Sequence, residues 1–274
     1  MLTRPFGASS LHLPLIGLGT WQSFDIGTDT ATRAARTEVL REFAVLGGTM
    51  IDSSPMYGRA ETVVGDLVPA VPPPWRPFIA TKVWTRGKRE GIAQMEDSMR
   101  KLRAPVIDLM QVHNLLDVDH HLASLADWKA SGRVRLVGVT HYNESAYGEV
   151  EAVLRKHRVD ALQINYSVAE RAAERRLLPL AAEQGIAVII NRPFAGGDLI
   201  RRIQSRALPA WAAELGCTSW AQLLLKFVVS QPAVSCAIPA MSSAAHVRDC
   251  MAAGLGPLPD AAQRARMIEA ARGA

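Results

Sequence analysis

The residues Asp52 and Tyr57 stand five positions apart in the stretch GGTMIDSSPMYGRAE, which covers residues 47–61. Two glycines end the helical pattern before it, as glycine commonly does at a helix C-terminus. The run Thr49, Met50 and Ile51 is long enough for a short buried parallel strand, which needs no polar alternation. Asp52 is therefore expected at the C-terminal end of a strand, with Tyr57 on the following loop. In α/β folds, chemistry collects at that end of the sheet.

Two further ionisable residues end apolar runs in the same way. PFIATK ends at Lys82, and IDLMQVH ends at His113. Taken singly, these residues have ordinary interpretations: a helix cap, a loop aromatic, a surface cation and a core histidine. Taken together, a carboxylate, a phenol, an ammonium and an imidazole at matched strand ends favour a catalytic group. The predicted catalytic residues are Asp52, Tyr57, Lys82 and His113.

The elements that position these residues alternate between strands and helices. Successive strands are expected to end at residues 52, 82, 113, 140, 163, 191 and 239, and one more ends near Gly19. All steps but the last are one strand-helix unit long, and the last leaves room for an inserted loop or short helix near 194–216. Eight such units predict a (β/α)8 TIM barrel of the α/β class. An open Rossmann sheet is disfavoured because no G-x-G-x-x-G motif follows the first strand.

Additional segments complete this architecture. A β-hairpin is predicted for residues 2–12. Single helices are predicted for residues 172–184 and for residues 218–230, and a last helix is predicted after Pro259. Ser242 and Ser243 are expected to cap a helix that runs to residue 253. The proline-rich stretch 69–77 is interpreted as a loop, so residues 1–274 are expected to form a single domain.

Composition excludes several classes of function. The 274 residues are 49% hydrophobic with a net charge of +5 spread along the chain, which is typical of a globular protein. The densest basic stretch, 171–176, contains no aromatic residues, so nucleic-acid binding is not expected. No signal peptide or membrane span is predicted. Three cysteines without a CxxC pair indicate reduced thiols and a cytoplasmic location, and no metal site is expected.

The ordered motifs GGTMIDSSPMYG, FIATKVW, LMQVHN and IPAMSSAAHVRDC resemble those of the aldo-keto reductases over nearly the whole chain. This resemblance implies a (β/α)8 barrel and hydride transfer between a nicotinamide cofactor, usually NADPH, and a carbonyl or alcohol. Carbonyl reduction also needs a proton, and a free tyrosine has a pKa of about 10. Tyr57 is therefore expected as the proton donor, with Lys82 lowering its pKa and Asp52 holding Lys82. A neutral His113 would orient the carbonyl oxygen.

The resemblance also implies cofactor contacts, although several positions differ from the family pattern. Asn191 stands where a stacking tyrosine is frequent, and Ala240, His246, Asp249 and Cys250 replace residues around the adenosine 2′-phosphate. NADPH is therefore expected as cofactor, with NADH possible. The expected cofactor-binding residues are Gly19, Thr20, Trp21, Asp52, Thr140, His141, Gln163, Asn191, Arg192, Pro193, Phe194, Ser242, His246, Arg248 and Cys250.

The expected substrate pocket contains two indole side chains, which suit apolar or aromatic carbonyl compounds. Its predicted residues are Trp21, Met56, Tyr57, Trp84, His113 and Asn114. The partner is expected to be a small-molecule carbonyl substrate, and the protein a monomer or small homo-oligomer.

Two other functions stay open at this point. The same fold can serve as a regulatory or sensing protein that binds the cofactor with negligible turnover. Alternatively, Lys82 can act as a Schiff-base nucleophile in a barrel lyase. Cofactor-dependent turnover of small aldehydes separates the first alternative from a reductase, and borohydride trapping on Lys82 identifies the second.

Overall fold

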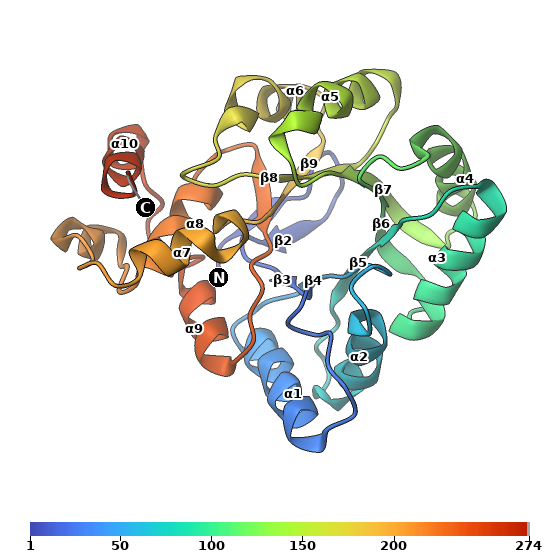
Figure 1. The fold of residues 1–274 in the computed structure, drawn as a ribbon, viewed down its shortest axis with the longest axis horizontal. Helices are drawn as coiled ribbons and strands as arrows, with labels where there is room; N and C mark the ends of the chain where they lie inside the picture. Colours follow the sequence, from blue (N-terminus) through green and yellow to red (C-terminus); the bar gives the residue numbers. More distant parts are fainter. Residues whose placement is uncertain (273–274) are drawn as a thin grey trace.

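A computed structural model describes residues 1–272 and contains a sheet of eight parallel strands in sequence order (Figure 1). Isolated bridges from Ile16 to Ala237 and from Gly19 to Ala240 join the first strand to the last and close the barrel. The predicted (β/α)8 fold class is confirmed. The strands are β3 (Leu18–Gly19), β4 (Met50–Asp52), β5 (Phe78–Val83), β6 (Ile107–His113), β7 (Val134–Thr140), β8 (Ala161–Asn165), β9 (Ala187–Asn191) and β10 (Val234–Ala237).

The helices surround this barrel, and most lie where the periodicity places them. They are α1 (Thr30–Val45), α2 (Ala60–Leu67), α3 (Lys88–Leu102), α4 (Val118–Ala130), α5 (Tyr147–Lys156), α6 (Leu177–Glu183), α7 (Asp198–Ile203), α8 (Trp220–Val229), α9 (Ala244–Ala252) and α10 (Ala261–Ala270). Short 3-10 turns are η1 (Val68–Ala70), η2 (Glu144–Ala146), η3 (Ala172–Arg175), η4 (Ala195–Gly197) and η5 (Ala210–Leu215).

The structure corrects two details of the helical prediction. The single helix expected over 172–184 is split into η3 and α6 at Arg176, whose φ of −142° is not helical. The proline-rich stretch that was expected to be a loop begins with a short helical turn, η1. The long interval before the last strand does hold inserted elements, because η4, α7 and η5 lie between β9 and α8.

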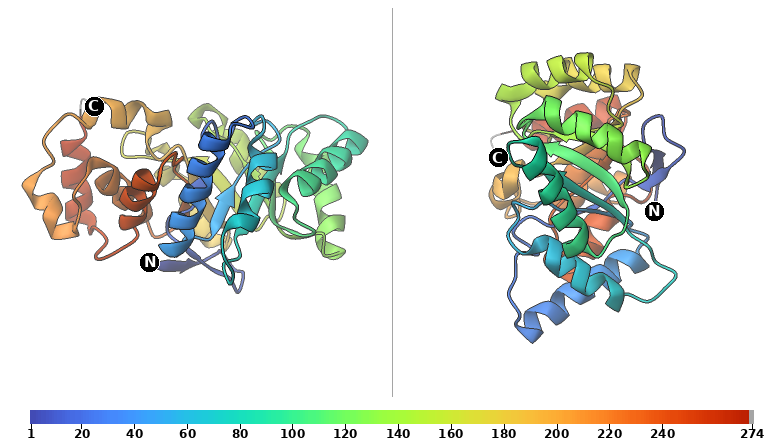
Figure 2. Two further views of the ribbon diagram at one scale, coloured as in Figure 1. Left: turned by 90° about the horizontal axis from the view of Figure 1, so that it is seen from below. Right: turned by 90° about the vertical axis from the view of Figure 1, so that its right-hand side faces the viewer.

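The N-terminal hairpin is formed by β1 (Thr3–Pro5) and β2 (His12–Pro14), which pair antiparallel at one end of the barrel (Figure 2). Phe6 and Leu13 belong to the same buried cluster as inward-facing residues of the strands, among them Met50, Leu109 and Ile189. The hairpin therefore closes the bottom of a side-chain-filled barrel and leaves the opposite, C-terminal end for a site.

Two local features set the edge of that site. Gly19 lies so close to the last strand that a Cβ there would stand 2.7 Å from the carbonyl oxygen of Ile238, so only glycine allows this closure. Ser243 caps α9 by accepting a hydrogen bond from the amide of His246. Ser242 was expected to share this role, but its hydroxyl lies instead 3.1 Å from Nδ1 of His246.

No helix among the described residues is long and apolar enough to cross a membrane. Within residues 1–272, no group of histidine, cysteine and acidic side chains is arranged to hold a metal ion. The cysteines Cys217, Cys236 and Cys250 are all buried and unbonded to one another.

Candidate active site

Lys82 and Asp52 form a buried ion pair at the C-terminal ends of neighbouring strands. Nζ of Lys82 lies 2.6 Å from Oδ2 of Asp52 and donates a second hydrogen bond to the carbonyl oxygen of Ser53 at 2.7 Å. Both side chains are almost entirely shielded from solvent, with exposures of 0% and 2%. Burial by itself would lower the pKa of Lys82, but the charge of the Asp52 carboxylate, with a smaller contribution from Tyr57, outweighs it, so the pKa lies above its usual value. Lys82 is therefore an ammonium at neutral pH.

The other oxygen of Asp52 is held by two amides on the barrel interior. Oδ1 accepts hydrogen bonds from Nε2 of Gln163 at 2.8 Å and from Nε2 of Gln111 at 3.2 Å. These contacts satisfy the carboxylate on the side away from the ammonium. Breaking a buried charge pair of this kind is costly because the remaining charge has no solvent.

Tyr57 lies directly above the ammonium. Nζ of Lys82 is 5.1 Å from the centre of the Tyr57 ring, and the ring of His113 meets that of Tyr57 edge-on at 6.1 Å. Burial raises the pKa of Tyr57 by more than the charge of Lys82 lowers it. The charge of Lys82 acts in the expected direction, but loss of solvent disfavours the phenolate more strongly, so the pKa of Tyr57 lies above its usual value in the protein alone. Tyr57 stays protonated at neutral pH and keeps a proton to donate.

His113 completes the group from the end of β6. Burial, the Lys82 charge and nearby His141 lower its pKa to about 2, so its ring is neutral, as expected. Nδ1 of His113 lies 3.1 Å from the hydroxyl oxygen of Ser54. The structure thus brings together all four residues that the strand ends predicted: an ammonium–carboxylate pair, a protonated phenol and a neutral imidazole.

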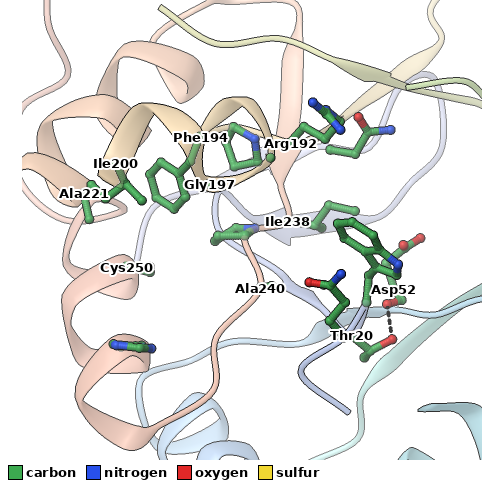
Figure 3. A pocket seen from close by; sticks show the side chains of 18 of the residues that line it. Thr20, Asp52, Arg192, Phe194, Gly197, Ile200, Ala221, Ile238, Ala240 and Cys250 are labelled. Carbon is green, nitrogen blue, oxygen red and sulfur yellow. Dashed lines mark hydrogen bonds between the residues drawn. The ribbon is translucent and has the colours of Figure 1, made fainter. Parts of the chain in front are cut away.

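A cavity of about 1080 Å³ opens above these residues and extends along the C-terminal end of the barrel. Thr20 and Asp52 lie at one end of it, whereas Phe194, Ile200 and Cys250 lie at the other (Figure 3). Most of the predicted contact residues line it: Gly19, Thr20, Trp21, Asp52, Met56, Tyr57, Trp84, His113, Asn114, Thr140, Gln163, Asn191, Arg192, Pro193, Phe194, His246 and Cys250.

The polar wall of the cavity has hydrogen-bonding capacity left over. Thr140 donates to Oε1 of Gln163 at 3.3 Å, and Nδ2 of Asn191 donates to the carbonyl oxygen of His141 at 3.2 Å. Oδ1 of Asn191 and Nε of Arg192 are buried without a hydrogen-bond partner. Because unpaired buried polar atoms are unfavourable, this wall fits a ligand that brings an amide N–H and an anionic group.

Four predicted residues do not line the cavity. Lys82 is completely buried next to Asp52, and the hydroxyl of Ser242 contacts the cavity residue His246 without itself lining the cavity. His141 stacks on Tyr142, with ring centres 5.5 Å apart. The guanidinium of Arg248 points to α1 and pairs with Glu42 at 3.2 Å. Arg248 stands two positions after His246 on α9, and residues two apart do not share a helix face.

Sequence reasoning missed several residues of the site, among them the buried side chains Gln111 and Ser54, which do not line the cavity. Gln111 could have been identified from the sequence, because it is a polar residue in an apolar strand. It stands two positions before His113, so the two side chains point to the same face of the strand. Ser54 carries no such signal, since serine is ordinary in a loop. The missed residues that do line the cavity include Tyr142, Gln204, Arg206 and Trp220, and the inserted segment supplies two of these, Gln204 and Arg206.

The chain matches the model of the Aldo/keto reductase family over residues 15–270. Methylglyoxal reductase YeaE of Escherichia coli (strain K12) is 29% identical over 248 residues, which are 88% of this chain and 85% of that protein. NADH-specific methylglyoxal reductase of the same strain is 26% identical over 241 residues, or 76% and 72% of the two chains. An aldo-keto reductase from Klebsiella pneumoniae, solved in complex with NADPH, superposes with a TM-score of 0.82 at 27% identity and covers 98% of this chain and 95% of its own. With the fold, the group formed by Asp52, Tyr57, Lys82 and His113, and this match over most of its length, the chain belongs to the aldo/keto reductase family.

Proposed function

We propose that the protein reduces aldehydes or ketones to alcohols with NADPH, or with NADH, and that Tyr57 is the general acid. The observation that carries the proposal is the buried Lys82–Asp52 pair beneath a protonated Tyr57 and beside a neutral His113, at the floor of one long cavity. Similarity to reductases of methylglyoxal and to a structure in complex with NADPH supports the same reaction.

The cavity offers suitable groups for each part of the cofactor. Thr140, Gln163 and Asn191 would hold the nicotinamide carboxamide, for which the unpaired Oδ1 of Asn191 is an acceptor. Arg192 would face the pyrophosphate, and His246 the adenosine end. When bound, the nicotinamide supplies the hydride. The protein's own residues then have to orient the carbonyl and deliver a proton.

The hydroxyl of Tyr57 gives its proton to the carbonyl oxygen as negative charge develops there. The Lys82 ammonium, 5.1 Å from the ring centre, stabilises the phenolate that remains. Asp52 keeps Lys82 protonated and fixed in place. His113 donates a hydrogen bond to the same carbonyl oxygen and orients it. The raised pKa of Tyr57 fits this order of events, because the phenolate forms only during the transfer.

The mouth of the cavity favours apolar substrates. Trp21, Met56 and Trp84 line it with 47%, 39% and 41% of their surfaces exposed, respectively. A flat or apolar carbonyl compound would cover this surface, and each large side chain that it buries contributes favourable free energy of about 1–3 kcal/mol. The natural substrate is therefore expected among apolar or aromatic aldehydes and ketones.

The structure disfavours the lyase alternative. A Schiff-base lysine must lose its proton to act as a nucleophile, whereas the pKa of Lys82 is raised. In addition, Lys82 is completely buried and does not line the cavity. The regulatory alternative keeps the same cofactor contacts and differs only in having negligible turnover.

The experiment is a panel of carbonyl compounds assayed with NADPH and NADH, using wild type and Tyr57→Phe. The variant keeps the ring and deletes the hydroxyl, so kcat should fall about 100-fold or more while the cofactor Kd stays the same. A Tyr57→Phe enzyme with most of its kcat would contradict the role of Tyr57. Cofactor binding by wild type without turnover on any compound would support the regulatory alternative.

A further inference from the structure

The residue beneath the imidazole of His113 is Ser54, a buried serine on the loop between β4 and α2. Its hydroxyl oxygen lies 3.1 Å from Nδ1 of His113, and its exposure is 0%. Its carbonyl oxygen accepts a hydrogen bond from the amide of Tyr57 at 3.0 Å. Ser54 therefore touches both residues that are proposed to face the carbonyl oxygen, and the proposed reaction gives its side chain no role so far.

The hydrogen-bond network defines which atom donates. The hydroxyl oxygen of Ser54 accepts a hydrogen bond from the amide of Met56 at 3.4 Å. Among the described residues, its own hydrogen has no acceptor other than Nδ1 of His113. The hydroxyl therefore donates to Nδ1. A neutral imidazole that accepts at Nδ1 carries its hydrogen on Nε2, so Nε2 is the donor.

This geometry matters because the two tautomers of His113 would act in opposite ways. With hydrogen on Nε2, the ring donates to a carbonyl oxygen and stabilises its developing negative charge. With hydrogen on Nδ1, an unprotonated Nε2 would face that oxygen and repel it. We propose that Ser54 is a positioning residue that fixes His113 as the Nε2–H tautomer and thereby prepares it to bind the carbonyl oxygen.

The inference deepens the proposed reduction, and its kinetic part rests on that function, but the tautomer can be measured without any substrate. Side-chain ¹⁵N spectra of protein labelled in its 7 histidines report which ring nitrogen carries hydrogen. The His113 signals are identified by their loss in His113→Gln. In wild type we expect His113 as neutral Nε2–H. In Ser54→Ala, where Nδ1 has lost its donor, we expect both tautomers to be populated.

The kinetic expectation follows from the loss of one hydrogen bond that acts on the reacting oxygen. In Ser54→Ala, kcat/KM for an aldehyde should fall about tenfold, while the NADPH Kd stays within twofold of wild type. A matched control is Ser124→Ala, because Ser124 is also buried but donates to the carbonyl oxygen of His120 on α4, away from the cavity. This control should leave the tautomer and kcat/KM unchanged.

A double-mutant cycle separates positioning from support of the Tyr57 loop. If Ser54 acts through His113, Ser54→Ala should cause almost no further loss of kcat/KM in a His113→Gln background. An equal tenfold loss in both backgrounds would overturn the proposal, since Ser54 would then act through the loop. The proposal also fails if wild type shows the Nδ1–H tautomer, or if Ser54→Ala keeps a single Nε2–H tautomer and full activity. An inactive wild type with the expected tautomer would count against the proposed function alone.

Discussion

Lys82 and Asp52 form an ion pair 2.6 Å long that is shielded from solvent on all sides, and Tyr57 lies above it. The pair joins β5 to β4 at the C-terminal end of the barrel. The ion pair therefore affects the stability of the barrel, and it also keeps the positive charge of Lys82 next to the phenol of Tyr57.

Removing either partner should destabilise the fold. Lys82→Met leaves a buried carboxylate without its counter-ion, and we expect a loss of about 3–5 kcal/mol in the free energy of unfolding. Urea denaturation of wild type and of the variant measures this difference in the free energy of unfolding. The control is Lys129→Met, because Lys129 pairs with Asp160 at a similar distance of 2.6 Å but is 44% exposed. The control should lose less than about 1 kcal/mol. If both variants lost the same amount of unfolding free energy, burial of the Lys82–Asp52 pair would not account for its contribution to stability.

Alkaline pH should weaken the same region. The pKa values of Lys82 and Tyr57 are both raised in the folded protein. A raised pKa contributes stability that is fully present below the unfolded-state value and is lost as pH rises through the folded-state value. Since both unfolded-state values lie near 10, wild type should lose stability above about pH 10. Urea titrations at pH 8 to 11 should show a smaller loss in Tyr57→Phe, and an equal loss would contradict this origin.

Cofactor preference should respond to Ala240 but not to Arg248. Ala240 lines the cavity beside His246, so Ala240→Lys should place an ammonium near the 2′-phosphate. We expect the preference for NADPH over NADH in kcat/KM to rise about tenfold or more. Arg248→Ala is the matched comparison, because that guanidinium already pairs with Glu42 and points away. A marked loss of NADPH preference in Arg248→Ala would mean that the arginine turns toward the phosphate.

Arg36 of α1 should support the cofactor site from behind. It donates to the carbonyl oxygens of Ser23 and Ser242, and these two loops carry the cavity residues Gln22 and Ala240. Arg36→Met removes both bonds, and we expect the NADPH Kd to rise about tenfold with kcat at saturation little changed. Fluorescence titration measures the Kd.

The control for Arg36 lies one turn earlier on the same helix. The guanidinium of Arg33 pairs with Asp66 of α2 at 2.7 Å. Arg33→Met should leave the NADPH Kd unchanged. If the two variants bound NADPH equally well, the loops would hold their positions without Arg36.

The buried carboxyl of Glu61 should make the barrel less stable at neutral pH than in acid. Glu61 is 1% exposed, and burial raises its pKa, although Thr81 donates to it at 2.5 Å. Its stabilising contribution is present below about pH 4.3 and is lost as pH rises. Glu61→Gln should therefore be more stable to urea than wild type at pH 8 and no more stable near pH 4.5. A variant that is less stable at both pH values would contradict this account.

The sequence by itself determined the order of strands and helices and the placement of Asp52, Tyr57, Lys82 and His113 in one group. Parallel strands in a barrel all end at the same face, so residues that follow apolar runs, such as Asp52, Lys82 and His113, must meet there. This inference needs only the strand ends, and periodic apolar runs mark those clearly. The inserted segment near 194–216 was predicted for the same reason, from the length of one interval.

Tertiary structure decided the directions of individual side chains and the balance of opposing effects. Whether Arg248 faces the cavity or Glu42 depends on the rotation of α9, which no local pattern fixes. Burial raises the pKa of Tyr57 and the charge of Lys82 lowers it. Which effect is larger depends on how completely residues far apart in the chain shield the phenol from solvent. Ser54 becomes informative only when folding places its hydroxyl beside His113, 59 positions later in the sequence.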